Sequence, residues 1–134
     1  MRVFVDTNVL VAAFATRGLC ADVLRYILAD HQLGTGEVVL TELRRALSRG
    51  FKLPPATVEG ILELLREHEV VPKPKAPSEL PIRDPDDRWI LASAVDAKAD
   101  VLITGDADLL DIATSAPLRV LAPRAFWDLV RTTR

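Results

Sequence analysis

The sequence VFVDTN at residues 3–8 and the sequence VLITGD at residues 101–106 decide the expected fold. Each begins with a short apolar run, which is typical of a parallel strand that is buried on both faces. Each run is followed closely by an acid, Asp6 after the first and Asp106 after the second. We therefore expect two buried parallel strands that deliver their carboxylates to the same edge of one sheet.

Helices alternate with strands along the rest of the chain. Apolar spacing predicts helices over residues 7–15, 19–30, 37–49, 58–68, 84–99, 108–113 and 123–131, and further short strands at 32–35, 69–71 and 119–121. This alternation predicts an α/β fold with a mainly parallel sheet and right-handed crossovers. The proline-rich stretch 71–81 is interpreted as a surface loop, so residues 1–134 are expected to form a single domain.

Composition excludes several classes of protein. The chain has 134 residues, of which 49% are hydrophobic, so it is not a disordered tail. Its formal net charge of -2 excludes a polycation that binds nucleic acid by net charge alone. Cys20 is the only cysteine, which excludes an intramolecular disulfide and a cysteine-rich zinc site. No stretch reaches the roughly 18 apolar residues of a membrane helix, and we expect a cytoplasmic protein without a membrane partner.

Four acids are candidates for a shared site. Asp6 and Asp106 follow the two buried strands, and they converge if those strands are parallel neighbours. Asp87 lies in the first turn of the helix that leads back to the second strand, so it is expected at the same edge. Glu42 lies on the flank of an apolar helical stripe, between buried and exposed positions. The sequence thus places four carboxylates at one edge of the sheet.

Each candidate also has a purely structural interpretation. In the sequence DPDD at residues 84–87, Asp84 has the position of a helix N-cap, and Asp106 has the same position before the helix that follows it. Glu42 alone would be a solvated residue. Convergence favours a site, because clustered acids repel one another unless a cation is present, and all-oxygen ligands suit Mg²⁺ or Mn²⁺, as one ion or two. His31 and His68 are remote from these motifs and are interpreted as structural or solvent-facing.

The four acidic motifs together resemble the PIN domain family. The resemblance rests on VDTNVL at residues 5–10, the helix with Glu42, DPDDRWILASA at 84–94 and LITGDADLL at 102–110, and it spans nearly the whole chain. The PIN proteins it is most similar to are the prokaryotic VapC-like toxins of type II toxin–antitoxin systems. The resemblance implies a three-layer α/β/α sandwich and a metal-dependent nuclease that acts on single-stranded RNA.

The resemblance also implies roles for particular residues. Asp6, Glu42, Asp87 and Asp106 match the four acids of the family, which are its catalytic residues and metal ligands. Asn8 and Thr104 match supporting polar positions, and Asp108 is a substitute for Asp106 or a residue that supports it. The DPDD motif leaves Asp84 and Asp86 as rivals of Asp87. An antitoxin partner and a homodimer formed by the early helices are further implications.

Basic residues follow Glu42 on its helix. Arg44, Arg45 and Arg49 are candidates for RNA binding, with a solvated helix face as the alternative. Lys73 and Lys75, in the proline-rich loop, are interpreted as residues that favour solubility. The predicted function is a Mg²⁺- or Mn²⁺-dependent endoribonuclease. Two alternatives remain: a non-catalytic PIN module that binds RNA or protein, and a receiver or phosphotransfer domain, although position 8 is Asn and not Asp.

Overall fold

The computed structural model describes residues 1–132 and contains one five-stranded sheet. All neighbouring strands are parallel, in the order β3-β2-β1-β4-β5. The strands are β1 (Arg2–Val5), β2 (Gln32–Gly36), β3 (Glu69–Val71), β4 (Val101–Ile103) and β5 (Arg119–Leu121). The predicted α/β class with a parallel sheet is confirmed.

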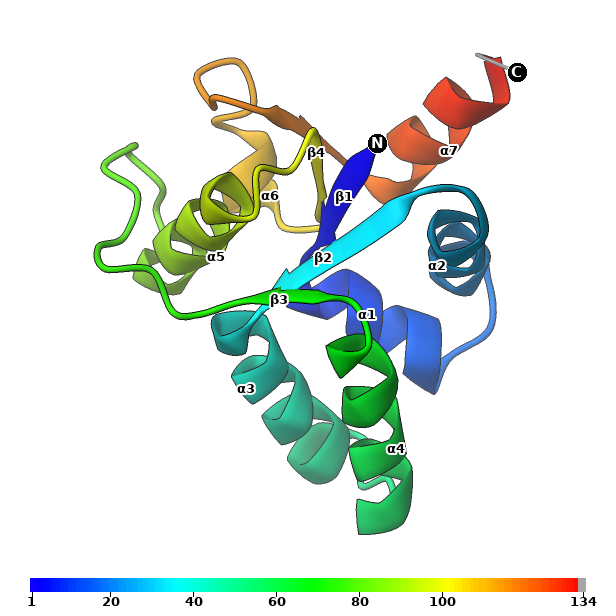
Figure 1. The fold of residues 1–134 in the computed structure, drawn as a ribbon. Helices are drawn as coiled ribbons and strands as arrows, with labels where there is room; N and C mark the ends of the chain where they lie inside the picture. Colours follow the sequence, from blue (N-terminus) through cyan, green and yellow to red (C-terminus); the bar gives the residue numbers. More distant parts are fainter. Residues whose placement is uncertain (133–134) are drawn as a thin grey trace.

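Helices cover both faces of this sheet, which gives the three layers of an α/β/α sandwich (Figure 1). Helices α5 and α6 lie on one side, and α1, α2 and α7 lie on the other, while α3 and α4 extend beyond one edge. Their bounds are α1 (Thr7–Ala15), α2 (Leu19–Asp30), α3 (Glu37–Arg45), α4 (Pro55–Arg66), α5 (Pro85–Asp96), α6 (Ala107–Leu110) and α7 (Pro123–Thr132).

Some helix ends differ from those predicted. Helix α3 does not run on as an α-helix but continues into a π-helical turn, η1 (Ala46–Gly50). Helix α5 ends at Asp96 because Lys98 adopts a φ of 54°, which an α-helix does not accommodate. Helix α6 is shorter than predicted and starts one residue earlier, at Ala107, directly after its cap Asp106.

The core lies on both faces of the two central strands. Residues Val3, Phe4 and Val5 of β1 and all three residues of β4 are at most 2% exposed. This burial is the physical reason for their continuous apolar runs. Among the described residues no single helix has the length and apolar composition of a membrane span. Helices α1 and α2 pass that test only as a pair, bent by 103° at the break between them.

The order of the strands creates a switch point between β1 and β4. From β1 the chain builds β2 and β3 on one side, and then returns to build β4 and β5 on the other side. At such a point the connections after the two strands diverge and leave a crevice outside their carboxyl ends. Asp6 and Asp106 follow the strands at this crevice, so the fold places them where a binding site is expected.

Candidate active site

The two strand-end acids lie side by side across β1 and β4. Val5 and Ile103 are partners in the parallel register, and the Asp6 N–H donates to the Ile103 carbonyl at 2.9 Å. Thr104, which is fully buried, links the two acids. Its hydroxyl donates to Asp6 Oδ2 at 2.7 Å and accepts from the Asp106 N–H at 3.0 Å.

Asp6 is held by three donors in total. Besides Thr104, the Thr7 N–H donates to Asp6 Oδ1 at 2.7 Å, which caps α1, and the Asn8 amide donates to Asp6 Oδ2 at 3.2 Å. Asn8 Oδ1 in turn accepts from the Gly105 N–H at 3.0 Å. Asn8 and Thr104, the two residues predicted to support the site, therefore both donate to Asp6, and both fix the loop after β4 against the start of α1.

Glu42 reaches the same site from α3. It is half-buried, and the Thr7 hydroxyl donates to Glu42 Oε2 at 2.8 Å. Thr7 thus holds Asp6 through its backbone and Glu42 through its side chain. Sequence reasoning did not single out Thr7. The signal available was its position directly after a strand-ending acid, where a hydroxyl can reach a neighbouring helix.

Asp87 is the acid of the DPDD motif that points into the protein. It is 7% exposed, and its N–H donates to the Asp84 carbonyl at 3.1 Å. Asp84 caps α5 by accepting from the Asp86 N–H at 2.9 Å, as its structural interpretation required. Asp87 Oδ2 is buried and has no hydrogen-bond partner. Capping and burial are therefore divided between two different acids of the motif.

Asp87 lies close to Asp106 and Asp108. One carboxylate oxygen of each lies within 4.8 Å of the others, so these three residues can hold a metal ion. Asp106 also caps α6, because its Oδ1 accepts from the Asp108 N–H at 2.9 Å. Asp108 lies 3.9 Å from the guanidinium Nε of Arg83, a largely exposed side chain.

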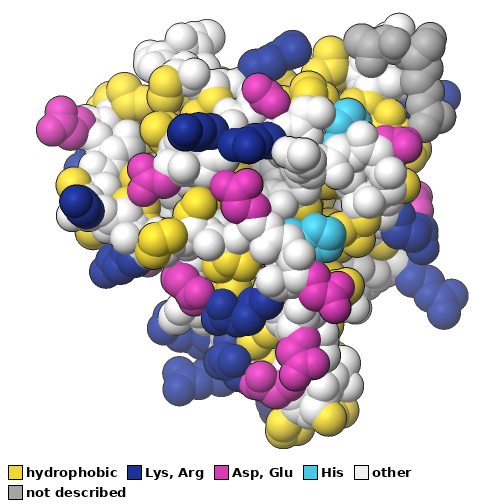
Figure 2. Space-filling model, viewed as in Figure 1, with side chains coloured by type: hydrophobic (Ala, Val, Ile, Leu, Met, Phe, Trp, Pro, Cys, Tyr) yellow, Lys and Arg dark blue, Asp and Glu magenta, His cyan; other side chains and the backbone are white. Residues whose placement is uncertain are grey.

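A cleft of about 500 Å³ opens at the carboxyl ends of β1 and β4. Its lining includes all four predicted acids, the rivals Asp84 and Asp86, and Arg45. Arg44 instead pairs with Glu59 on α4, and Arg49 lies exposed on η1. Of the three predicted RNA-binding arginines, only Arg45 is thus among the described residues that line the cleft. Figure 2 shows Lys and Arg side chains gathered over α3 and the lower end of the molecule.

The family model of the PIN domain matches residues 2–108. The chain belongs to the PIN domain family. Its fold is similar to solved structures of VapBC2 from Rickettsia felis, bound to a DNA fragment from their promoter, and of VapBC-1 from nontypeable Haemophilus influenzae. The first match has a TM-score of 0.59 at 16% identity and covers 90% of this chain and 97% of that one. The second has a TM-score of 0.59 at 22% identity and covers 92% and 99%.

No curated protein sequence is significantly similar to this chain. Membership of the PIN family removes the receiver or phosphotransfer alternative. The chain is a PIN-domain protein, as its sequence motifs indicated, and its fold is similar to that of the two VapBC structures.

The electrostatics of this PIN site favour protonated acids in the absence of a cation. Burial raises the pKa of Asp6, and the charge of Asp106 raises it further, against the hydrogen bonds from Thr104, Thr7 and Asn8. Burial likewise raises the pKa of Glu42, where the Thr7 hydrogen bond opposes it. Burial raises the pKa of Asp87 to about 8, together with the hydrogen bond and the charge of Asp106.

These features fit a divalent cation. The candidate ligand atoms are all carboxylate oxygens, which suit Mg²⁺ and Mn²⁺. The buried Asp87 Oδ2 lacks a partner, and a buried polar atom without a partner is costly unless a ligand satisfies it. A cation would also offset the repulsion that raises the pKa values of Asp6 and Asp87.

Proposed function

We propose that this PIN protein is a metal-dependent endoribonuclease that hydrolyses phosphodiester bonds of single-stranded RNA. The observation that carries the proposal is the buried, partnerless Oδ2 of Asp87 among the converging carboxylates. A cluster that served only to start helices would need Asp6, Asp84 and Asp106, which cap α1, α5 and α6. It would not need a buried Asp87 whose oxygen is left without a donor.

Asp6, Glu42, Asp87 and Asp106 are the residues that would hold one or two Mg²⁺ or Mn²⁺ ions, with Asp108 in support. When bound, the metal supplies Lewis acidity that activates water and stabilises charge on the phosphate. The chain supplies the rest. Thr104, Thr7 and Asn8 orient the carboxylates, as their hydrogen bonds to Asp6 and Glu42 indicate.

Two further roles fall to residues of the cleft. A carboxylate that lines the cleft, Asp87 or Asp106, would orient the attacking water. Arg45 lines the same cleft and would neutralise the phosphate backbone. The whole chain, residues 1–134, would act as one domain in the cytoplasm.

The biological role that we propose is the toxin of a type II toxin–antitoxin system. Support comes from the likeness in fold to two structures whose names are those of VapBC proteins. By the same likeness we propose an antitoxin protein as a partner. A homodimer formed by helices early in the chain is also proposed, as the family resemblance implies.

Cleavage of single-stranded RNA tests the activity. We expect cleavage with Mg²⁺ or Mn²⁺ and none after chelation. Asp87→Asn should reduce the rate by about a hundredfold or more, because loss of a ligand costs at least as much as loss of an outer partner. Asp84→Ala is the control on the same helix: it removes the cap of α5 and a neighbouring charge, should cost about 1 kcal/mol of stability, and should leave cleavage intact.

Three outcomes would count against the assignment. An active Asp87→Asn variant together with an inactive Asp84 variant would move the ligand within the motif. Cleavage that persists in excess chelator would exclude a metal role. A wild-type chain that binds RNA but cuts neither RNA nor DNA with either metal would be a non-catalytic PIN module.

A further inference from the structure

A second groove, of about 400 Å³, lies beside the acidic cleft. The two share three lining residues, Glu42, Arg45 and Asp86, so the groove is continuous with the cleft. Its far wall is formed by Lys73, from the loop between β3 and α5, and by Trp89 of α5. Trp89 lies three residues after Asp86 on α5, so the two side chains share a helix face, and Asp86 lines both the groove and the cleft.

The sequence suggested that Lys73 is a solvated loop residue, but its ammonium contacts an aromatic ring. Its ammonium lies over the Trp89 ring, 4.5 Å from the ring centre. The following residue, Pro74, is buried, which anchors the loop at this point. Further along, the Ser78 N–H donates to the Arg88 carbonyl at 3.0 Å. The loop is thereby tied to α5, and the cation and the ring are held together at the groove.

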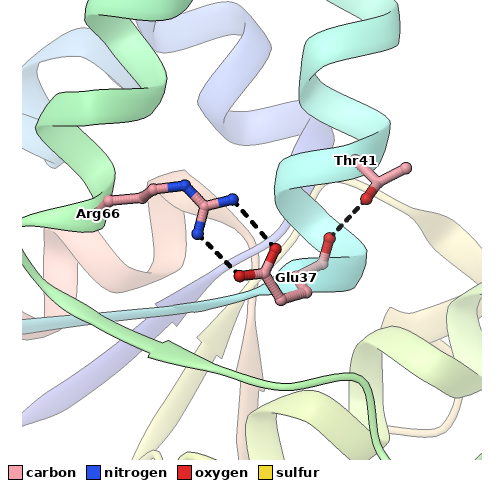
Figure 3. A network of polar contacts seen from close by, with 3 residues as sticks. All are labelled: Glu37, Thr41 and Arg66. Atoms are coloured by element: carbon pink, nitrogen blue, oxygen red, sulfur yellow. Dashed lines mark hydrogen bonds and ion pairs between the residues drawn. The ribbon is translucent and has the colours of Figure 1, made fainter.

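The acid at the other end of the groove is already neutralised. Glu37 accepts two hydrogen bonds from the Arg66 guanidinium, at 2.8 and 3.1 Å (Figure 3). The Arg66 hydrogen bonds lower the pKa of Glu37, so this acid stays ionised and paired. Thr41 donates to the Glu37 carbonyl at 2.9 Å on the same turn (Figure 3). The other two acids of the groove, Glu42 and Asp86, are those that also line the acidic cleft, and the cations of the groove are Arg45 and Lys73.

We propose that this groove binds the nucleotide next to the cleaved phosphodiester, with its base stacked on Trp89 and its phosphate held by Lys73 and Arg45. The proposal rests on the proposed ribonuclease function and names a subsite of that same site. A flat aromatic face beside two cations matches the chemistry of single-stranded nucleic acid, which offers a base and a phosphate at every step. An anionic peptide would use the cations but would leave the indole face without a planar partner.

Lys73 changes its contact when the nucleotide enters. An exposed cation–π contact is weak, whereas a base stacked on an aromatic ring binds more strongly. A base therefore displaces the ammonium from the ring, and the ammonium moves to the neighbouring phosphate, where the opposite charge attracts it. Purines have the larger stacking surface, so the groove favours a purine at this position.

Tryptophan fluorescence tests the subsite without RNA cleavage. Trp127, the second tryptophan, packs against Tyr26 at a ring distance of 6.0 Å, outside both grooves. In a Trp127→Phe, Asp87→Asn protein with Mg²⁺, Trp89 is the only tryptophan and RNA should survive the titration. An oligoadenylate should quench its fluorescence, an oligouridylate should quench it more weakly, and linear polyphosphate of equal charge should leave it unquenched.

Kinetics on the otherwise native chain give the second measurement. Trp89→Ala should raise KM about tenfold with a much smaller change in kcat, because it removes binding of the flanking base. Trp89→Phe should restore most of the loss. Lys73→Ala should raise KM and reduce its dependence on salt, whereas Lys75→Ala, in the same loop but outside the groove, should match wild type.

The results separate failure of the subsite from failure of the ribonuclease. Equal quenching by RNA and polyphosphate, or no quenching by either, overturns the subsite, as does an unchanged KM in Trp89→Ala. A protein partner would then be the alternative ligand of the groove. Metal-dependent cleavage of RNA by the wild type would still support the proposed ribonuclease function. Quenching by RNA in a chain that never cleaves RNA would keep the subsite and overturn the function.

Discussion

Asp87→Asn is expected to stabilise the metal-free protein at neutral and alkaline pH. Burial, and then the hydrogen bond and charge of Asp106, raise the pKa of Asp87 from 3.8 to about 8. Between those two values the folded chain binds the proton and the unfolded chain does not. The contribution of Asp87 to the free energy of unfolding is therefore fully present below about pH 4, and it is lost as the pH rises towards the folded-state pKa.

The size of the effect follows from the pKa shift. The shift from 3.8 to about 8 spans about four pH units, each worth about 1.4 kcal/mol. At about pH 7 most of that range has been crossed, and about 4 kcal/mol of stability has been lost. Asparagine does not titrate, and its amide can donate to Asp106, but burying the amide costs roughly 1–3 kcal/mol. We expect a net gain of about 2 kcal/mol for the variant.

Urea denaturation followed by circular dichroism in EDTA measures this gain. The variant should be more stable than the wild type at about pH 7.5, and the difference should vanish by about pH 5. Asp96→Asn, at the exposed end of the same helix, should change stability by less than about 0.5 kcal/mol. Mg²⁺ should then stabilise the wild type more than the variant, because we propose that the ion binds the folded chain through Asp87. Parallel pH profiles for wild type and Asp87→Asn would refute the reasoning.

The other predictions concern metal, support, RNA and assembly. Calorimetry should show Mn²⁺ binding that Asp6→Asn weakens; equal affinity would remove Asp6 from the site. Thr104→Val should cost about 1–3 kcal/mol in urea denaturation, since it takes a donor from Asp6 and leaves the Asp106 N–H unpaired, and Thr104→Ser should recover it. Arg45→Ala should weaken RNA binding and flatten its salt dependence, whereas Arg44→Ala should not, because Arg44 pairs with Glu59. Light scattering at a protein concentration of roughly tens of micromolar should detect a dimer. A monomer at that concentration would count against the proposed assembly.

The convergence of the strand-end acids could be predicted from sequence because it depends on short-range rules. An apolar run of three or four residues fixes a buried strand, and parallel strands share their carboxyl edge. Asp6 follows such a run directly, and Asp106 follows one after Thr104 and Gly105. The alternative capping roles of Asp84 and Asp106 were also correct, because a cap depends only on residues next to it. Placement and capping turned out to be compatible properties of the same acid.

Features that depend on contacts between distant residues could not be predicted from the sequence. The π-helical turn after α3 has no pattern of its own, and the shared role of Thr7 depends on how closely α1 packs against α3. The meeting of Lys73 with Trp89 needs the course of a proline-rich loop, which local spacing does not define. Arg44 likewise pairs with Glu59 of α4 and does not line the cleft, although it is next to Arg45 in the sequence.

Because Asp6 and Asp106 each have two roles, the proposed activity could be lost in evolution without loss of the fold. Each acid starts a helix as well as contributing charge to the cleft. Alanine at either position would loosen a helix start, but asparagine caps nearly as well as aspartate and carries no charge. A descendant freed from selection for the proposed cleavage, yet still selected to fold, would therefore drift towards asparagine at position 106, where the cap needs one acceptor oxygen. At position 6 the amide NH₂ would face the donors Thr104 and Asn8, which opposes the same drift. In such a lineage, an amide at position 106 would mark a chain that has kept the fold and lost the proposed activity.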